Sequence, residues 1–153
     1  MPVTYNVGVD SLLEDFSYPV LVAGNAYAVH SSPEGLKTVP PSLANAGIYN
    51  GVWIVDSNGK SRHVKETVRD GPKRRSWNPF RKDEIRIEFV FDGEAATLSV
   101  DEVKVLLFAG FARHAGVMGS ILAALRARLE PAQTLSDLFR ILTAEQDAWR
   151  RTL

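Results

Sequence analysis

Three histidines are the side chains of this chain best suited to proton transfer or metal binding near neutral pH. They are His30, His63 and His114, and no two of them have the spacing of a metal-binding motif such as HxH or HExxH. The chain contains no cysteine, which excludes thiolate metal sites, disulfides and a cysteine nucleophile. The sequence therefore predicts no metal site and no cofactor.

Motifs that expose a nucleophile or hold a phosphate are absent from the sequence as well. There is no GxSxG, GxGxxG or GxxxxGK[ST], and Ser120 lies in the apolar stretch GVMGSILAAL, which favours a packing role. One enzymatic hypothesis remains: ribonuclease-like catalysis by His63 with Lys65 and a second histidine. It needs two groups that titrate near neutral pH and a cation to hold a phosphate. Because no complete catalytic motif is present, we expect a protein that is not an enzyme.

Charge is distributed unevenly along the chain, although the formal net charge is zero. Residues 1–59 carry one lysine and five acids, residues 60–82 carry nine basic and two acidic residues, and residues 83–153 carry eight basic and eleven acidic residues. A basic segment of this density attracts an anionic partner. The alternative is a solvated hairpin and loop whose charges pair with the acidic ends of the same domain.

Aromatic residues alternate with basic ones in the second half of that segment, DGPKRRSWNPFRK, residues 70–82. Basic side chains that meet phosphates, with aromatic rings that stack on bases, are typical of single-strand binding. The neutral total charge and the acidic flanking regions count against nucleic acid. Arginine and aromatic residues are also the most frequent hot spots of protein interfaces. We therefore predict a protein-binding surface at Arg74, Arg75, Trp77, Phe80 and Arg81, with the acidic amino-terminal region as the alternative contact.

Length and composition indicate one ordinary globular domain spanning residues 1–153. The chain has a mass of 16.9 kDa, with 45% hydrophobic and 24% charged residues. No apolar run approaches the roughly 18 residues of a membrane span, and the amino terminus has no secretory signal pattern. Together with the absence of cysteine, this favours a cytoplasmic protein with no membrane partner.

Strands are predicted in the first two thirds of the chain. Residues 18–24 and 26–30 have strand patterns, and residues 31–47 are expected to form a long loop because they hold three prolines and two glycines. Ile48–Val55 is apolar on both faces, which predicts a central strand covered on both sides. Asn58–Gly59 predicts a two-residue hairpin turn, and the polar return strand Lys60–Arg69 is expected to be an outer strand.

The next strand, Glu84–Phe91, alternates clearly between apolar and charged residues. Asp92–Gly93 is expected to be a turn before a short strand at Ala95–Leu98. A capping box formed by Ser99 and Glu102 predicts the start of a helix that runs to about His114. Two further apolar stripes, separated by Pro131, predict a helix ending near Leu129 and a last helix that starts at Thr134 or Ser136.

Strands followed by helices predict an α+β fold: a mostly antiparallel sheet with two or three carboxy-terminal helices packed on it. The predicted core joins one face of the strand over 84–91 to the apolar stripes of the helices. The strand contributes Ile85, Ile87, Phe89 and Phe91, and the helices contribute Leu106, Leu107, Leu125 and Leu138.

The central block of the sequence resembles a family of small bacterial proteins. It reads IYNGVWIVDSNGKSRHVKETVRDG, then WNPFRKDEIRIEFVFDG, then LSVDEVKVLLF. The G-x-W-I-V-D-x-x-G-K hairpin, the aromatic-rich loop, the R-I-E strand and the short helix, over about residues 48–108, resemble immunity proteins encoded beside polymorphic or contact-dependent toxins.

The resemblance implies a cytoplasmic protein that binds a cognate toxin domain and neutralises it by occluding its active site or a nearby exosite. Such pairs gain association speed and specificity from complementary charge. Two alternatives stay open from the residues themselves: a nucleic-acid-binding module that uses residues 60–82, and the small ribonuclease-like enzyme.

Overall fold

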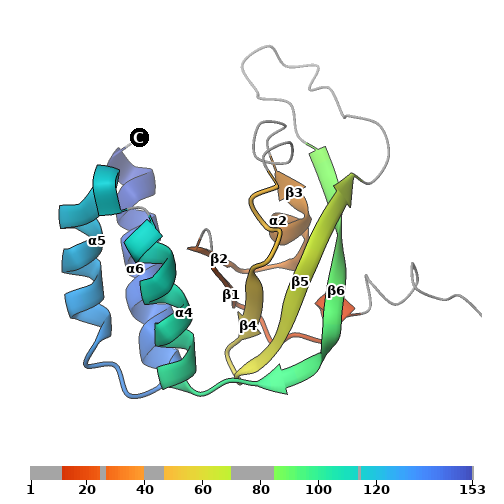
Figure 1. Cartoon of the computed structure of the whole chain (residues 1–153), viewed down its shortest axis with the longest axis horizontal. Helices are drawn as coiled ribbons and strands as arrows, with labels where there is room; N and C mark the ends of the chain where they lie inside the picture. Colours follow the sequence, from red (N-terminus) through yellow and green to blue (C-terminus); the bar gives the residue numbers. More distant parts are fainter. Residues whose placement is uncertain (1–11, 25–26, 40–46, 70–84, 114, 153) are drawn as a thin grey trace, which may run out of the picture.

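The computed structural model describes residues 12–24, 27–39, 47–69, 85–113 and 115–152. A curled, six-stranded antiparallel sheet stands beside a layer of three carboxy-terminal helices, as shown in Figure 1, which confirms the α+β prediction. The strands lie in the order β2-β1-β4-β5-β6-β3 across the sheet. Their bounds are β1 Val20–Ala23, β2 Tyr27–His30, β3 Thr38–Val39, β4 Trp53–Asp56, β5 Lys60–Arg69 and β6 Ile85–Thr97.

The hairpin between β4 and β5 is confirmed, but its turn differs from the predicted one. Gly59 donates its N–H to the carbonyl of Asp56 over 3.0 Å, and Gly59 has a φ of 89°. No described residue other than glycine has a positive φ, so Asn58 does not use the left-handed region. Gly59 is thus the last residue of a β-turn formed by residues 56–59, and it takes the left-handed conformation. A Cβ at Gly59 would lie 2.8 Å from the carbonyl oxygen of Leu98, so a side chain does not fit there.

The predicted central strand is shorter than its apolar pattern suggests. It begins at Trp53 rather than Ile48, because Gly47 and Gly51 have φ values of 63° and 79° and the chain turns between them. The prediction of β5 as an outer strand was wrong, since β5 pairs with β4 on one side and β6 on the other. Its polarity therefore has a cause other than an edge position.

The predicted turn at Asp92–Gly93 lies inside β6, which is one strand of 13 residues. Pairing with β5 continues on both sides of it, from His63↔Asp92 to Lys60↔Thr97, with a shift in register between Ser61 and His63. Gly93 has a φ of 82°, so it accommodates an irregularity in the ladder rather than a reversal of the chain.

The long loop expected over residues 31–47 contains regular structure. A short helix, α2, spans Pro33–Lys37 and is followed directly by β3, which pairs with β6. Ser32 caps α2, because its hydroxyl accepts the N–H of Gly35 over 3.2 Å, and Pro33 fits the first helical position. Pro33 thus marks the start of a helix rather than a loop, and residues 40–46 of the predicted loop lie outside the described residues.

The three helices of the layer are α4 Val100–Arg113, α5 Ala115–Leu129 and α6 Leu135–Thr152. The predicted capping box is confirmed, with Ser99 and Glu102 exchanging bonds of 3.1 and 3.2 Å. α4 packs on β1, and α6 packs on β2. Gly110 permits this approach, since a Cβ there would overlap the carbonyl oxygen of Gly24. In the part of the chain that the structure describes, no helix has both the length and the apolar character needed to cross a membrane.

The sheet separates two hydrophobic cores, whereas the sequence predicted one. Ile85, Ile87 and Phe89 are buried as expected, but Leu107, Leu125 and Leu138 belong to the other core. The reason is the alternation of side chains across a strand together with the position of the helices over β1 and β2. Phe91 and Leu106 are partly buried, in different cores.

Each core has a distinct membership. The first core, on the helix side, includes Leu21, Ala23, Val29, Val55, Val103, Leu107, Phe111, Leu122, Leu125, Leu129, Leu138, Phe139 and Leu142. The second core, on the opposite face, consists of Leu13, Phe16, Val20, Val22, Leu36, Val39, Tyr49, Val52, Ile54, Val64, Ile85, Ile87 and Phe89.

Because the two cores are separate, mutations in them should act independently. We expect Ile87→Val to lower the free energy of unfolding by about 0.5–1.5 kcal/mol and Leu125→Ala by about 2–5 kcal/mol. In the double variant these losses should add to within about 0.5 kcal/mol, as measured by urea denaturation. Tyr27→Leu with Phe111→Leu is the coupled control, since those rings touch with centroids 5.2 Å apart. Strong coupling between positions 87 and 125 would contradict the two-core arrangement.

A buried carboxylate holds the β4–β5 turn. Asp56 is 1% exposed, and its Oδ1 accepts the N–H groups of Asn58 and Lys60, each over 2.9 Å. Its Oδ2 accepts the N–H of Ser17 over 2.9 Å, from the segment that leads into β1. The Asp56 side chain therefore connects the β4–β5 turn to the segment that precedes β1, 39 residues earlier in the chain.

Replacing that carboxylate should be costly. Asp56→Asn keeps the shape but turns an NH₂ group toward backbone donors, so we expect it to lower the free energy of unfolding by about 1.5–3 kcal/mol. Asp92→Asn is the control, since its side chain is 63% exposed, and it should stay within about 0.5 kcal/mol of the parent. Equal stability of both variants in thermal and urea denaturation would count against the role of Asp56.

Candidate functional site

The predicted binding residues Arg74, Arg75, Trp77, Phe80 and Arg81 lie outside the described residues. Their segment joins the end of β5 to the start of β6, so these two strands determine where it leaves the fold. Among the described residues, the side chains of β5 and β6 are therefore the ones that lie next to the predicted binding segment in the chain.

Three cross-strand pairs define one face of β5 and β6: His63↔Asp92, Glu66↔Val90 and Val68↔Glu88. The β6 members alternate with Ile87, Phe89 and Phe91, which point into the second core. His63 and Glu66 would face opposite sides of a regular strand, because they are three residues apart. The register shift between Val64 and Glu66 brings them to the same side. We call His63, Glu66, Val68, Glu88, Val90 and Asp92 the open face.

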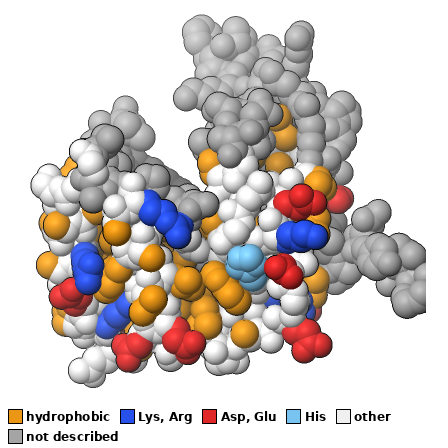
Figure 2. Space-filling view, in the orientation of Figure 1, with side chains coloured by type: hydrophobic (Ala, Val, Ile, Leu, Met, Phe, Trp, Pro, Cys, Tyr) orange, Lys and Arg blue, Asp and Glu red, His pale blue; other side chains and the backbone are white. Residues whose placement is uncertain are grey.

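The open face begins where the helical layer ends. Ser61 pairs with Val55 of the first core and is fully buried, whereas His63 pairs with the half-buried Trp53. From His63 onward, none of the described β5 or β6 residues belongs to the first core, and Val68 is 41% exposed. Figure 2 shows a histidine and charged side chains of both signs over the strands, and a mixture of hydrophobic and charged side chains over the helices. Since none of the described helices covers this part of β5, the strand can be polar although it is an inner strand.

An aromatic and charged row crosses the boundary of the open face. The rings of Trp53 and His63 lie 5.1 Å apart between centroids, and His63 Nδ1 lies 3.6 Å from a carboxylate oxygen of Asp92. These residues come from three neighbouring strands that are fixed by the sheet register. A half-buried aromatic beside charged groups resembles the centre and rim of a protein interface.

The structure does not bring together the two described histidines required by the ribonuclease-like hypothesis. His30 alternates with Val29 of the first core, so it points to the face opposite His63. The two strands are three steps apart, which is about 14 Å at the usual strand spacing. His114 lies outside the described residues. Within the described ranges, no group of histidine, aspartate and glutamate side chains could hold a metal ion.

His30 instead faces a buried tyrosine. Its Nε2 lies 3.2 Å from the hydroxyl of Tyr49, which belongs to the second core. Burial raises the pKa of Tyr49, so its hydroxyl stays neutral. The neutral hydroxyl forms a hydrogen bond with the imidazole of His30. Tyr27 likewise has a raised pKa, from burial and then from the negative charge of Glu145.

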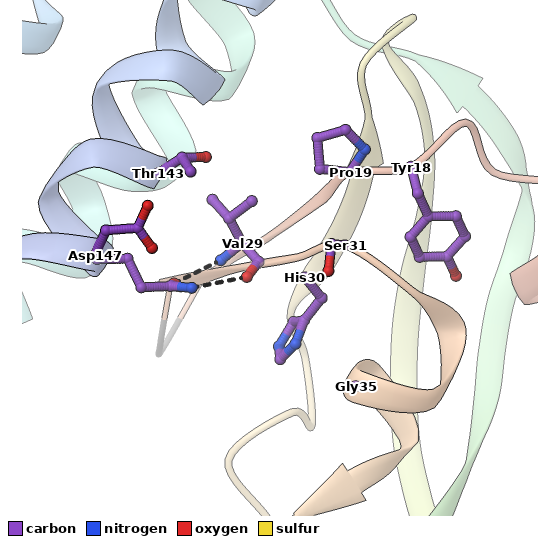
Figure 3. A pocket seen from close by; sticks show the side chains of 9 residues that line it. Tyr18, Pro19, Val29, His30, Ser31, Gly35, Thr143 and Asp147 are labelled. Carbon is purple, nitrogen blue, oxygen red and sulfur yellow. Dashed lines mark hydrogen bonds between the residues drawn. The ribbon is translucent and has the colours of Figure 1, made fainter. Parts of the chain in front are cut away.

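A cavity of about 440 Å³ lies between the end of β2 and α6. Figure 3 shows Thr143 and Asp147 projecting from α6 on one side and His30 and Ser31 on the other. His30 and Asp147 both interact with other groups of the protein. Gln146, which also lines the cavity, accepts the N–H of Val29 and donates to its carbonyl, each over 3.0 Å, and so satisfies the outward backbone groups of an edge strand. Gln146 therefore attaches α6 to the sheet.

Comparison of the chain with protein-family models, with curated proteins and with solved structures found no match. The resemblance to immunity proteins therefore stays a prediction, which rests on the residues quoted above.

The separation of the histidines leads to a prediction for RNA. We expect the purified chain to leave single-stranded RNA intact, because the two described histidines cannot act on one phosphate as an acid and base pair. The measurement is cleavage of a fluorescently labelled RNA over a range of protein concentrations. Cleavage that copurifies with the parent protein and disappears in His63→Ala would contradict the prediction.

Proposed function

We propose that this chain is an immunity protein that binds a cognate toxin domain and neutralises it by occluding the toxin's active site or a nearby exosite. The observation that carries the proposal is the open face: a sheet surface that none of the described helices covers, with Trp53 at its boundary and Val68 exposed within it. Apolar and aromatic groups surrounded by charged ones are the composition of a protein-binding patch.

The proposal also includes the predicted loop residues. Residues 70–84 connect the two strands of the open face, so Trp77, Phe80 and the three arginines are attached to its end. In the proposal the loop and the open face contact the same partner. The protein acts in the cytoplasm and needs no catalytic group of its own, since occlusion is sufficient to block a toxin.

The test combines binding with protection. The chain and the product of the adjacent upstream gene are co-expressed, and growth is compared with expression of that product alone. We expect restored growth and a complex with a dissociation constant of about 1 nM or tighter, measured by calorimetry on the purified proteins. No complex and no protection would remove the immunity proposal.

Two matched substitutions locate the contact. Val68→Arg places a large cation in the open face, whereas Val105→Arg makes the same change on α4, where the valine is 68% exposed. Both should stay within about 0.5 kcal/mol of the parent in stability. We expect Val68→Arg to weaken the complex at least tenfold and Val105→Arg to leave it unchanged.

The loop and the nucleic-acid alternative are tested with the same proteins. Reversing Arg74, Arg75 and Arg81 to glutamate should weaken protection, and full protection would exclude these residues from the contact. If the chain binds nucleic acid instead, its affinity for single-stranded RNA should fall by orders of magnitude between about 50 and 200 mM salt.

A further inference from the structure

The sheet sorts the charges of β5 onto its two sides. Lys60 lies 5.9 Å from the centre of the Phe16 ring, and Arg62 lies 5.9 Å from that of Phe91. Both rings belong to the second core or pack against it, so both cations are on the side away from the open face. Glu66, by contrast, lies on the open face, where it is exposed to solvent.

The remaining charges of the open face are mostly acidic. Glu66, Glu88 and Asp92 are distributed along it, and Asp92 is 63% exposed. Arg86 shares their side of β6, but Glu34 of α2 binds its guanidinium at 3.0 and 3.2 Å. Lys65 is exposed at the register shift, between the paired positions. Among the described residues, the face thus carries more acidic than basic side chains, together with the apolar surface of Trp53, Val68 and Val90.

We propose that the open face binds a basic surface of a folded partner protein, with lysine or arginine side chains opposite Glu66, Glu88 and Asp92. This inference rests on the proposed function and adds the chemistry of the partner to it. Opposite charges on two surfaces accelerate association, and a like-charged surface would be repelled. Val68 and Trp53 then supply the apolar contact that a purely electrostatic encounter lacks.

The first experiment measures how fast the complex with the adjacent gene product forms, by stopped-flow fluorescence of Trp53 and the other tryptophans. Glu66→Lys should slow association by roughly five- to tenfold at low salt. The difference from the parent should shrink toward about 1 M salt, where the Debye length is near 3 Å. Asp101→Lys, an equal charge change on an exposed residue of α4, is the control and should have less than twofold effect.

The outcomes separate the two proposals. If the complex forms and protects but Glu66→Lys associates like Asp101→Lys, the basic-partner inference is overturned and the immunity proposal stands. If the chain alone forms a dimer that Glu66→Lys dissociates, the occupant of the face is a second copy, whose own basic segment supplies the cations, and the inference is again overturned.

A second measurement does not depend on the adjacent gene product. A capped six-residue peptide of alternating lysine and leucine is titrated into the isotope-labelled chain and followed by amide chemical shifts. We expect concentration-dependent shifts at His63, Glu66 and Val68, and none for the same peptide with glutamate in place of lysine. Absence of shifts on the open face, or equal shifts with both peptides, would overturn the inference.

Discussion

The carboxylate of Asp56 fixes the register on which the rest of the sheet depends. It accepts the backbone N–H groups of Asn58 in the β4–β5 turn, of Lys60 at the start of β5 and of Ser17, so it joins the central hairpin to the chain entering β1. The turn sets which residue of β5 lies beside Trp53, and that residue is His63. The register shift between Val64 and Glu66 then brings Glu66 to the same side as His63, so the turn and this shift together set the composition of the open face.

The helical layer covers only part of one sheet face. The covered part is apolar, whereas the rest of that face carries charged side chains. α4 and α6 lie on β1 and β2, where close approach is possible at Gly110 and where Gln146 binds the edge of β2. The apolar residues under the helices form the first core. Beyond Ser61 the same face carries charged side chains, because none of the described helices excludes water from it. Folding and the proposed partner binding therefore involve different parts of one sheet face.

The second core makes the uncovered half possible. β5 and β6 are anchored from their other side by Val64, Ile85, Ile87 and Phe89, so they need no helix to stay folded. A sheet buried on one face can present the other to solvent at little cost. The open face can then carry charge without destabilising the strands, which is compatible with the proposed role in partner binding.

The sequence by itself determined those elements whose signals act over a few neighbouring residues. The β4–β5 hairpin, the alternation of residues 85–91, the capping box at Ser99 and three helices were all predictable, because turn glycines, alternation and capping act within a few residues. The loop residues chosen for binding lie outside the described part of the chain and stay a prediction. Tertiary structure alone decided that Ile87 and Leu125 belong to separate cores, that β5 is an inner strand, and that His63 shares a face with Glu66. Those outcomes depend on which side of the sheet the helices cover and on one shift in register, and neither leaves a periodic signal in the sequence.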